Sequence, residues 1–499
     1  MNTRVNSFHA RRVYLSSGEV EQSGSAAKIG APFDRSLDTP NRASVLLSPP
    51  RLLSDAEDGV TPRVNGILLL YHRPLEASAS TIVEHVQAFP QHSRFPVWCV
   101  NTEFGFPRSL SGFQFSVVVL HYSLFGIVPY RLDDRFLDYL NSSGSYTVAF
   151  FQDEHHHCRT RFAFLDRYAV DCIYTLLEPA HWPDVYGKHT DVRTLFYTIP
   201  GYVSDEFVAK AAQFQKPDSE RRIDIGYRGR TLLPYMGRGG QEKARIGIDV
   251  LERAAGSGLT LDIEVDEQSR LYGDDWLAFL SDCRATLGTE AGVSVFDVED
   301  VVRLEYERLV AENPAMTFDE LSAQLLEPWE DNVYYRTVSP RHFEAAALRV
   351  CQILFEGKYS GILQPMTHYI PLKKDYSNWE DVLCLFRDPK VRRELTENAY
   401  RDLIASRRYA YERFIDEFDE NLVAAGVELE AGPALAAAVT ESLARDRRRL
   451  ERLAQLRASL HRDFPGRRFL RPLGRSSRYW YGRWSERRAT RPASARADE

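Results

Sequence analysis

The sequence predicts an α/β protein with two doubly wound domains, each built on a parallel β-sheet. Short, fully apolar runs of strand length alternate with segments of helical spacing, and this alternation occurs twice along the chain. Apolar runs separated by helices are typical of strands buried on both faces of a parallel sheet. Because a Pro200-Gly201 break separates the two series, we expect two Rossmann-like domains that face one another across a cleft.

The first series begins at Val64, after a segment rich in Ser, Gly, Pro and Arg. Since that segment has no sustained period, we expect residues 1–62 to form a disordered leader. The first domain is predicted to span residues 63–203. Its predicted elements are strands at 64–71, 95–100, 115–121, 146–151, 170–175 and 193–196, and a helix at 78–88.

The second series follows and is predicted as a domain of residues 204–425. Residues 298–332 are expected to form a helical insertion, and 379–406 and 408–422 closing helices. Its other predicted elements are strands at 223–227, 260–265, 285–288 and 351–355, and helices at 241–255, 276–283 and 340–350. A helical C-terminal extension is expected beyond it, with an amphipathic helix at 430–462 and a basic, aromatic tail at 463–499.

The composition excludes a single small module and disfavours a membrane-spanning chain. The 499 residues are 44% hydrophobic, enough for a large core, and no stretch approaches the roughly 20 apolar residues of a membrane-spanning helix. An apolar signal-peptide core is not visible near the N-terminus. The six cysteines lie far apart without a Cys-x-x-Cys pair, which favours reduced thiols and a cytoplasmic location.

Charge is distributed unevenly along the chain. The net charge is −7, yet residues 441–499 hold 17 Arg and only 7 acidic residues. The tail interleaves arginine with aromatic residues, a pattern that suits anionic lipid headgroups. We therefore expect a peripheral site at the inner face of the cytoplasmic membrane. RNA is the less favoured partner, and a merely disordered arginine-rich end is the alternative.

A loop with glycines and arginines follows the strand at 223–227 and runs into a helix. Glycines let backbone N–H groups approach a phosphate, and Arg or Lys near a helix N-terminus supplies charge for a diphosphate. The candidate diphosphate-binding residues of this segment are Arg228, Arg230, Arg238 and Lys243. In the alternative interpretation, Arg228 and Arg230 form surface ion pairs.

A second motif, Ser-Pro-Arg-His-Phe-Glu, runs from Ser339 to Glu344. Ser339 suits an N-cap, and a proline at the first helical position loses no hydrogen bond. Glu344 lies one turn into this helix, where its carboxylate can accept both hydroxyls of a ribose, while Arg341 can reach a phosphate. Alternatively, Glu344 only complements the helix dipole.

In the first domain, the strand at 146–151 runs into Gln-Asp-Glu-His-His-His. A strand end that opens on the cleft suits a catalytic base or an acceptor-orienting carboxylate, which selects Asp153, Glu154 and His155 as candidates. His121, at the end of the strand at 115–121, is a further candidate. A solvated loop and a structural histidine are the respective alternatives. A metal site is disfavoured because consecutive residues on one loop rarely converge on an ion.

Glu290 follows the strand at 285–288 in a turn-rich segment, Leu-Gly-Thr-Glu-Ala-Gly. It would lie close to a ligand bound at the strand ends if the strand order is standard. Otherwise the glycines of this segment only make the turn.

The Gly-Arg...Lys loop and the Phe-Glu-Ala-Ala-Ala helix resemble the donor-binding elements of GT-B glycosyltransferases, in particular the bacterial family 1-annotated and spore-maturation-type enzymes. The resemblance covers residues 64–425 in architecture and 222–418 in motifs. It implies that Arg238 and Lys243, with Arg230 nearby, bind the donor diphosphate and that Glu344 holds the ribose. It also implies that the amides around Ser360 and Gly361 approach the phosphates or the sugar.

Two residues depart from the pattern of that family. Retaining members often carry Glu-x7-Glu, whereas Arg336 stands eight residues before Glu344. Arg349 stands where a small residue is usual near the end of the helix. The Asp-x-Asp metal motif of GT-A enzymes is absent from the sequence, which favours chemistry without an obligatory metal.

The resemblance implies a metal-independent, hexosyltransferase-type glycosyltransferase of surface polysaccharide synthesis. It would move a sugar from a nucleotide-diphosphate donor, UDP- or GDP-linked, to a saccharide or lipid-linked acceptor. No cofactor is expected besides this donor, and a nucleic-acid partner is disfavoured. Two alternative functions remain. One is a GT-B-fold sugar-nucleotide epimerase, which needs no acceptor. The other is a non-catalytic assembly protein, which is favoured by the presence of Arg336 and Arg349 at motif positions.

Overall fold

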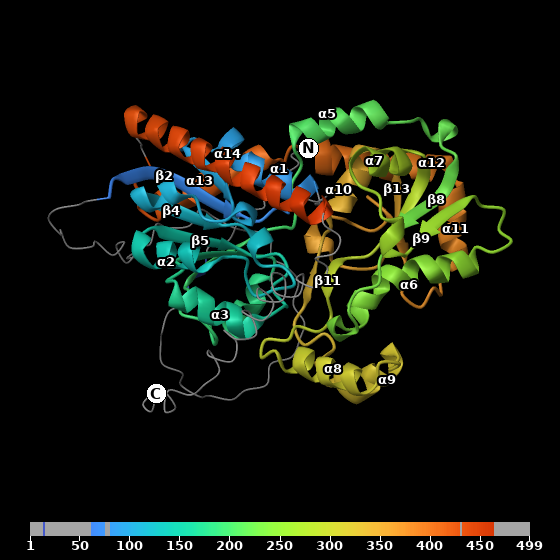
Figure 1. Cartoon of the computed structure of the whole chain (residues 1–499). Helices are drawn as coiled ribbons and strands as arrows, with labels where there is room; N and C mark the ends of the chain where they lie inside the picture. Colours follow the sequence, from blue (N-terminus) through green and yellow to red (C-terminus); the bar gives the residue numbers. More distant parts are fainter. Residues whose placement is uncertain (1–12, 15–60, 75–79, 430–431, 464–499) are drawn as a thin grey trace, which may run out of the picture.

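The computed structural model describes residues 13–14, 61–74, 80–429 and 432–463. The predicted leader and the predicted basic tail lie almost entirely outside these residues. Two α/β domains lie side by side, each with its own sheet (Figure 1). The predicted fold class of two Rossmann-like domains with a helical C-terminal extension is confirmed.

The first sheet has seven strands in the order β1-β7-β6-β5-β4-β2-β3. Neighbouring strands are parallel except β1, which pairs antiparallel with β7. All six predicted strands are present, and the apolar runs of the four at 63–71, 114–120, 146–150 and 172–175 are buried on both faces. The strands are β1 (Val13–Tyr14), β2 (Arg63–Tyr71), β3 (Val97–Asn101), β4 (Gln114–Leu120), β5 (Tyr146–Phe150), β6 (Cys172–Thr175) and β7 (Thr194–Tyr197).

Helices from both ends of the chain cover the first sheet. The cluster on one face joins Ile67 and Phe150 of the sheet to Phe89 of α1 and to Phe414 and Phe418 of α13. These helices are α1 (Ser80–His92), α2 (Asp134–Ser143), α3 (Cys158–Arg167), α4 (Trp182–Val185), α13 (Tyr411–Ala424) and α14 (Pro433–Asp463). The late helix α13 therefore packs on the first domain.

The C-terminal extension is also docked on the first domain. The indole of Trp98 donates a 2.9 Å hydrogen bond to Oγ1 of Thr440 on α14. Asp446 of the same helix accepts one from the amide of Ser109 at 2.7 Å. The long red helix in Figure 1 therefore lies against the first domain through contacts at two points of its length.

The second sheet has five parallel strands in the order β14-β13-β10-β8-β9. Its strands are β8 (Ile223–Arg228), β9 (Leu261–Glu264), β10 (Cys283–Gly288), β13 (Cys351–Phe355) and β14 (Ile370–Leu372). Its helices are α5 (Asp205–Phe214), α6 (Arg238–Arg253), α7 (Gly273–Ser281), α10 (Pro340–Ala347), α11 (Trp379–Arg387) and α12 (Pro389–Ala399). The four strands predicted here are present, and β14 is additional.

The chain crosses between the domains twice, at neighbouring places. Val203 accepts a hydrogen bond from the amide of Tyr411 at 3.1 Å and donates one to the carbonyl of Tyr409 at 2.8 Å. The first crossing lies beside the predicted Pro200-Gly201 break, and the second returns the chain to α13. These bonds tie the two crossing segments together.

The helical insertion predicted at 298–332 is present between two short antiparallel strands, β11 (Ala291–Val293) and β12 (Tyr335–Thr337). It contains α8 (Val301–Glu312), α9 (Phe318–Leu321) and a π-helical turn at Ser322–Leu326. Val302 and Leu321 of the insertion belong to one contiguous apolar cluster with Phe151 and Phe162 of the first domain. The insertion therefore contributes to the core of the first domain, although its chain leaves from the second.

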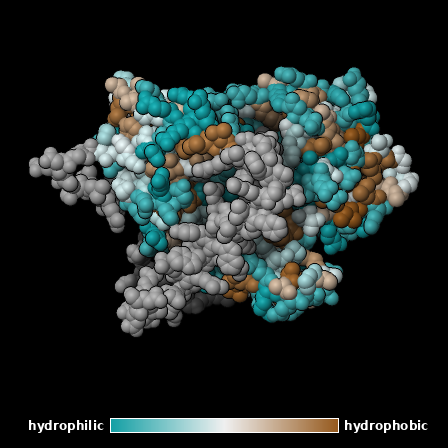
Figure 2. All heavy atoms as spheres, in the orientation of Figure 1, coloured by the Kyte–Doolittle hydropathy of each residue, from teal (hydrophilic) through white to brown (hydrophobic). Residues whose placement is uncertain are grey.

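The described surface in Figure 2 is mostly hydrophilic, with separate apolar patches. Exposed apolar side chains include Val301 and Leu304 on α8 and Leu453 and Leu456 on α14. Within the described ranges, no helix is long and apolar enough to cross a membrane.

Candidate functional site

The carboxyl ends of the strands of both sheets meet between the domains. Lys358, after β13, forms a 3.7 Å ion pair with Glu178, after β6. Asp153, after β5, lies close enough to Lys243 of α6 that the two charges shift each other's pKa. This is the place where ligands bind in open α/β sheets.

Lys243 places a half-buried ammonium in this region. Among the described residues it has no hydrogen-bond or ion-pair partner for that ammonium. Burial and, next, repulsion by Arg230 lower the pKa of Lys243 to about 8, while the carboxylate of Asp153 raises it and Arg341 lowers it. An unpaired cation between positive neighbours is poised to bind an anionic group.

The other basic residues of this segment divide into two groups. Arg230 and Arg238 are exposed, on the loop after β8 and at the first residue of α6. Arg228 instead ion-pairs with Asp262 at 2.8 Å, and its guanidinium carbon lies 4.0 Å from the ring centroid of Phe279. The ion-pair alternative therefore describes Arg228, whose charge is paired with Asp262. Arg228 does not join Arg230 and Arg238 as an exposed cation.

Arg341 and Glu344 lie on α10 around the side chain of Trp276. The side chain of Ser339 accepts the amide of Arg341 at 3.4 Å, as expected of the N-cap. The indole N–H of Trp276 donates to Oε2 of Glu344 at 2.7 Å, and the guanidinium carbon of Arg341 lies 4.9 Å from the tryptophan ring centroid. The guanidinium of Arg341 also donates to the carbonyl of Arg228. Burial raises the pKa of Glu344, and the bond from Trp276 opposes this.

Glu290 is buried and holds the loop that follows β13. Its carboxylate accepts the amide of Tyr359 at 2.7 Å and the hydroxyl of Tyr334 at 2.9 and 3.0 Å. Burial raises the pKa of Glu290, and these hydrogen bonds oppose the rise. Both oxygens of Glu290 are therefore engaged in holding the loop after β13.

Three consecutive residues of that loop have left-handed backbone conformations. The φ angles of Tyr359, Ser360 and Gly361 are 46°, 55° and 70°. Such angles cost about 1–2 kcal/mol for residues other than glycine, so contacts must hold the loop. The hydroxyl of Ser360 supplies one, since it lies 2.8 Å from Oγ1 of Thr337 and accepts the amide of Val338 at 3.2 Å. The strained loop is thus fixed at the carboxyl end of β13.

On the first domain, Asp153 is the predicted residue that reaches the space between the domains. It is partly open to solvent, yet its crowded surroundings raise its pKa through desolvation, while Arg161, Lys243 and Arg230 lower it. Charges from both domains thus act on this one carboxyl. Asp153 is the candidate that the structure brings together with Lys243.

Glu154 points into the core of the first domain instead. Its carboxylate accepts hydrogen bonds from Oγ1 of Thr175 at 2.6 Å, from the amide of Leu176 at 2.8 Å and from the hydroxyl of Tyr186. A buried carboxylate with this many donors is a structural group. The structure does not place Glu154 where an acceptor reaches it.

The histidine candidates are both buried. His121 places Nε2 3.0 Å from Nδ1 of His85 and Nδ1 2.9 Å from Oγ of Ser123, inside an aromatic cluster. This matches the structural-histidine alternative for His121. His155 adjoins the site, but neither ring nitrogen has a hydrogen-bond partner, and burial holds its pKa well below the usual range. In the part of the chain that the structure describes, no group of three His, Cys, Asp or Glu is arranged for a metal ion.

The two departures from the family pattern have clear positions. Arg336 contacts Glu242 at 3.2 Å and Asp331 at 3.0 Å, and Lys374 reaches the same Glu242 at 2.6 Å. An ion-pair network thus occupies the place of the missing glutamate. Arg349 lies just after the end of α10 and pairs with Glu397 of α12 at 2.8 Å, so it ties the turn after α10 to α12.

Trp276 is the residue of the site that the sequence did not reveal. It lies within the predicted helix at 276–283, where an aromatic residue on a helix is usually part of the core. Its role depends on Glu344, 68 positions later, and no local signal connects the two.

The sequence matches no protein-family model and no curated protein. Solved structures with a similar arrangement include sucrose-phosphate synthase from Thermosynechococcus elongatus, at 12% identity over 73% of this chain and 100% of that chain, with a TM-score of 0.40. An alpha-glucosyltransferase in complex with UDP-glucose and DNA gives 13% identity, 72% and 99% coverage and a TM-score of 0.42. TarM gives 11% identity and a TM-score of 0.36 over 60% of this chain, which spans 53% of TarM. Identities and TM-scores this low assign no function to this chain.

Proposed function

We propose that this protein is a glycosyltransferase that moves a sugar from a UDP- or GDP-linked donor to a saccharide or lipid-linked acceptor in surface polysaccharide synthesis. The observation that carries the proposal is the unpaired ammonium of Lys243, which lies between the domains beside Asp153. A cation on one domain and a carboxyl on the other suit a reaction that bridges them.

The donor diphosphate would be bound by Lys243, with Arg230 and Arg238 at its edge. Negative charge grows on the diphosphate as the sugar leaves, and preorganised cations stabilise that charge without a metal ion. The half-burial of Lys243 strengthens this interaction because the surrounding dielectric is low. Substrate binding would thus remove the electrostatic cost of leaving this ammonium unpaired.

The nucleoside would lie along α10, with its ribose on Glu344. One carboxylate oxygen of Glu344 is occupied by Trp276, and the other is left to accept a ribose hydroxyl. Arg341, fixed over the same indole, adds positive charge beside it. The pair distinguishes a ribonucleotide from a bare diphosphate.

Asp153 would orient the acceptor or take its proton. Desolvation raises the pKa of this carboxyl, which makes it a stronger base, while Lys243 and Arg230 keep it ionised. When the donor diphosphate neutralises these cations, the pKa of Asp153 would rise further. The base would therefore gain strength with the donor bound.

The basic face of α14 supports a peripheral membrane location. Arg448, Arg449 and Arg452 are exposed there beside Leu453 and Leu456. Arginines flanking exposed leucines suit an anionic bilayer surface, where a lipid-linked acceptor would be presented.

The proposal is tested by measuring the release of nucleoside diphosphate. The substrates are a panel of UDP- and GDP-sugars, each with and without saccharide acceptors. We expect the wild type to consume one donor and Lys243→Met to lower the rate at least a hundredfold. Lys210→Met is the matched control, because Lys210 of α5 forms an ion pair with Asp274 of α7 at the surface. Equal rates in Lys243→Met and the wild type would contradict the proposal, and conversion of the donor without diphosphate release would indicate an epimerase.

A further inference from the structure

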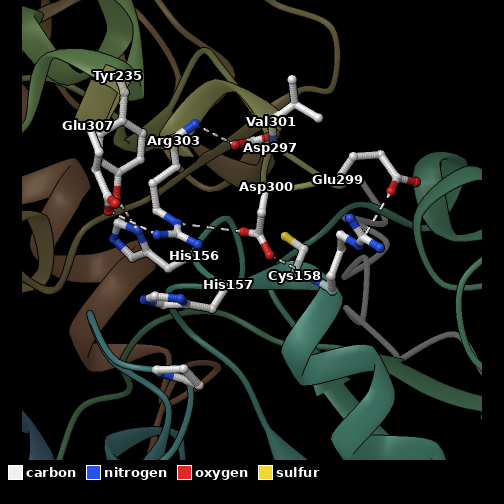
Figure 3. A network of polar contacts seen from close by, with 12 residues as sticks. His156, His157, Cys158, Tyr235, Asp297, Glu299, Asp300, Val301, Arg303 and Glu307 are labelled. Atoms are coloured by element: carbon white, nitrogen blue, oxygen red, sulfur yellow. Dashed lines mark hydrogen bonds and ion pairs between the residues drawn. The ribbon is translucent and has the colours of Figure 1, made fainter. Parts of the chain in front are cut away.

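The loop of residues 152–157 is held by side chains from beyond the first domain, Tyr235 and Tyr335. The hydroxyl of Tyr335 donates to the carbonyl of Gln152 at 2.6 Å. The hydroxyl of Tyr235 lies 2.7 Å from Nδ1 of His156, and Figure 3 shows these two side chains pointing toward one another. This loop carries Asp153, so its position depends on contacts made between the domains.

Helix α3 starts directly after this loop and lacks a side-chain cap of its own. The residue at the N-cap position, His157, has a φ of 54° and no capping hydrogen bond from its side chain. The missing acceptor comes from the insertion, because Oδ2 of Asp300 accepts the amide of Arg159 at 3.2 Å. Figure 3 shows Asp300 pointing toward Cys158, at the start of α3. The helix is therefore capped by a residue 141 positions away.

The carboxylate of Asp300 is available to cap α3 because a different residue, Asp297, caps α8. Asp297 accepts the amides of Val301 and Arg303 at 2.9 and 2.8 Å and so caps α8. Asp300 is 5% exposed and adopts a φ of 55°. Water therefore competes little for its hydrogen bond, and Arg303 lies 3.7 Å away as its ionic partner.

The first turns of α3 connect this cap to Asp153. The buried guanidinium of Arg161 donates to the carbonyl of Asp153 at 2.5 Å and to the carbonyl of Val128 at 3.2 Å. The thiol of Cys158 donates to the carbonyl of Glu154 at 3.1 Å. A shift of the first turn of α3 would therefore move the backbone that carries Asp153.

We propose that Asp300 is a positioning residue: it caps α3 from the insertion and thereby holds Asp153 opposite Lys243. The insertion thus helps to set the geometry between the domains. The cap is a property of the structure alone, whereas its effect on turnover rests on the proposed glycosyl transfer.

Three variants separate this role from a general loss of stability. Asp300→Gly removes the carboxylate and adopts the positive φ without strain. Asp300→Asn keeps an acceptor oxygen and tolerates the same backbone conformation. Glu305→Gln removes a carboxylate from the same helix, where Glu305 contacts Arg308 within α8.

Hydrogen exchange of peptides covering 152–162, measured on the full chain without substrate, tests the cap. We expect exchange about tenfold faster in Asp300→Gly, in keeping with the loss of an N-cap, and wild-type rates in Asp300→Asn and Glu305→Gln. Wild-type exchange in Asp300→Gly would overturn the proposal. If that variant unfolds as a whole, the same comparison is made in sucrose, an osmolyte that favours the folded state, with the same expectation.

Steady-state donor turnover tests the consequence for Asp153. We expect kcat to fall at least tenfold in Asp300→Gly while the Kd for nucleoside diphosphate stays within twofold, and Asp300→Asn to recover most of kcat. Equal losses in kcat and in nucleotide affinity would overturn the positioning role. If the wild type turns over no donor, the proposed function fails, and the exchange measurement still decides whether Asp300 caps α3.

Discussion

The indole N–H of Trp276 and the carboxylate of Glu344 are joined by a 2.7 Å hydrogen bond across two helices of the second domain. The same indole lies under the guanidinium of Arg341. One side chain of α7 thus fixes both polar residues that α10 directs into the site. Since burial alone would favour the neutral acid, the bond also helps to keep Glu344 ionised.

We predict that Trp276→Phe weakens nucleotide binding by about tenfold, because a hydrogen bond to a charged group contributes about 1.5–3 kcal/mol and part of that is recovered by water. The phenyl ring keeps a surface for Arg341, so the loss reports the N–H group. Calorimetry with the matching nucleoside diphosphate measures it. Inorganic pyrophosphate, which has no ribose, should bind both proteins equally, and an equal loss for both ligands would contradict the assignment.

The pH dependence of donor binding should follow Lys243. Its pKa is about 8, so the neutral amine forms as the pH rises through 8 and the diphosphate loses a charged partner. We expect the Kd to rise by up to about tenfold per pH unit above pH 8. In Lys243→Arg the charge persists at these pH values, and the Kd should stay flat. A wild-type Kd that does not change between pH 7 and 9.5 would contradict this role of Lys243.

Buried neutral histidines should make the fold sensitive to acid. Burial lowers the pKa of His85 to about 3, whereas an unfolded histidine titrates near 6.5. Between these values the unfolded chain binds the extra proton. The stability from neutral His85 is therefore complete above pH 6.5 and falls by about 1.4 kcal/mol per pH unit below it.

The variant His85→Gln should remove this contribution, since an amide keeps a hydrogen bond to His121 and does not titrate. We expect its free energy of unfolding in urea to fall less steeply than that of the wild type between pH 6 and 4.5, by about 1.4 kcal/mol per pH unit. His92→Gln, at the partly exposed end of α1, is the control. Parallel curves for His85→Gln and the wild type would show that His85 is not neutral in the fold.

The β11–β12 hairpin that carries the insertion should not tolerate a side chain at Gly292. Its φ is 106°, and a Cβ there would lie 2.1 Å from the carbonyl oxygen of Tyr335. We expect Gly292→Ala to lower the free energy of unfolding by more than the about 1–3 kcal/mol that backbone strain alone costs, as measured by urea unfolding. Gly256→Ala, whose φ is 76° but whose Cβ would meet no atom within 4 Å, isolates the clash from the backbone strain. Equal losses in both variants would refute the close approach.

The two sheets could be predicted because most of their strands are buried on both faces and so appear as apolar runs, as in β4, β6 and β13. β14, β11 and β12 escaped prediction because each has three residues, too few to establish a period. Their positions are set by neighbouring strands and by tertiary contacts.

The site was predictable by segment but not by side chain. Asp153 and Glu154 are adjacent in the sequence, yet one reaches the space between the domains and the other accepts bonds inside the core. Arg228 and Arg230 divide in the same way, because Asp262 is available to one of them. The capping of α3 by Asp300 could not be predicted from local sequence. The amide of Arg159 and the carboxylate that accepts its hydrogen bond are 141 positions apart.

The proposal that the second domain binds a nucleotide-sugar donor is tested most directly by calorimetric titration. The ligands are UDP, GDP, ADP and their common sugar conjugates, each measured with and without magnesium. We expect micromolar binding of one UDP- or GDP-linked nucleotide without metal, and its loss in Glu344→Ala. Absence of binding to every nucleotide, or binding that Glu344→Ala leaves unchanged, would contradict it.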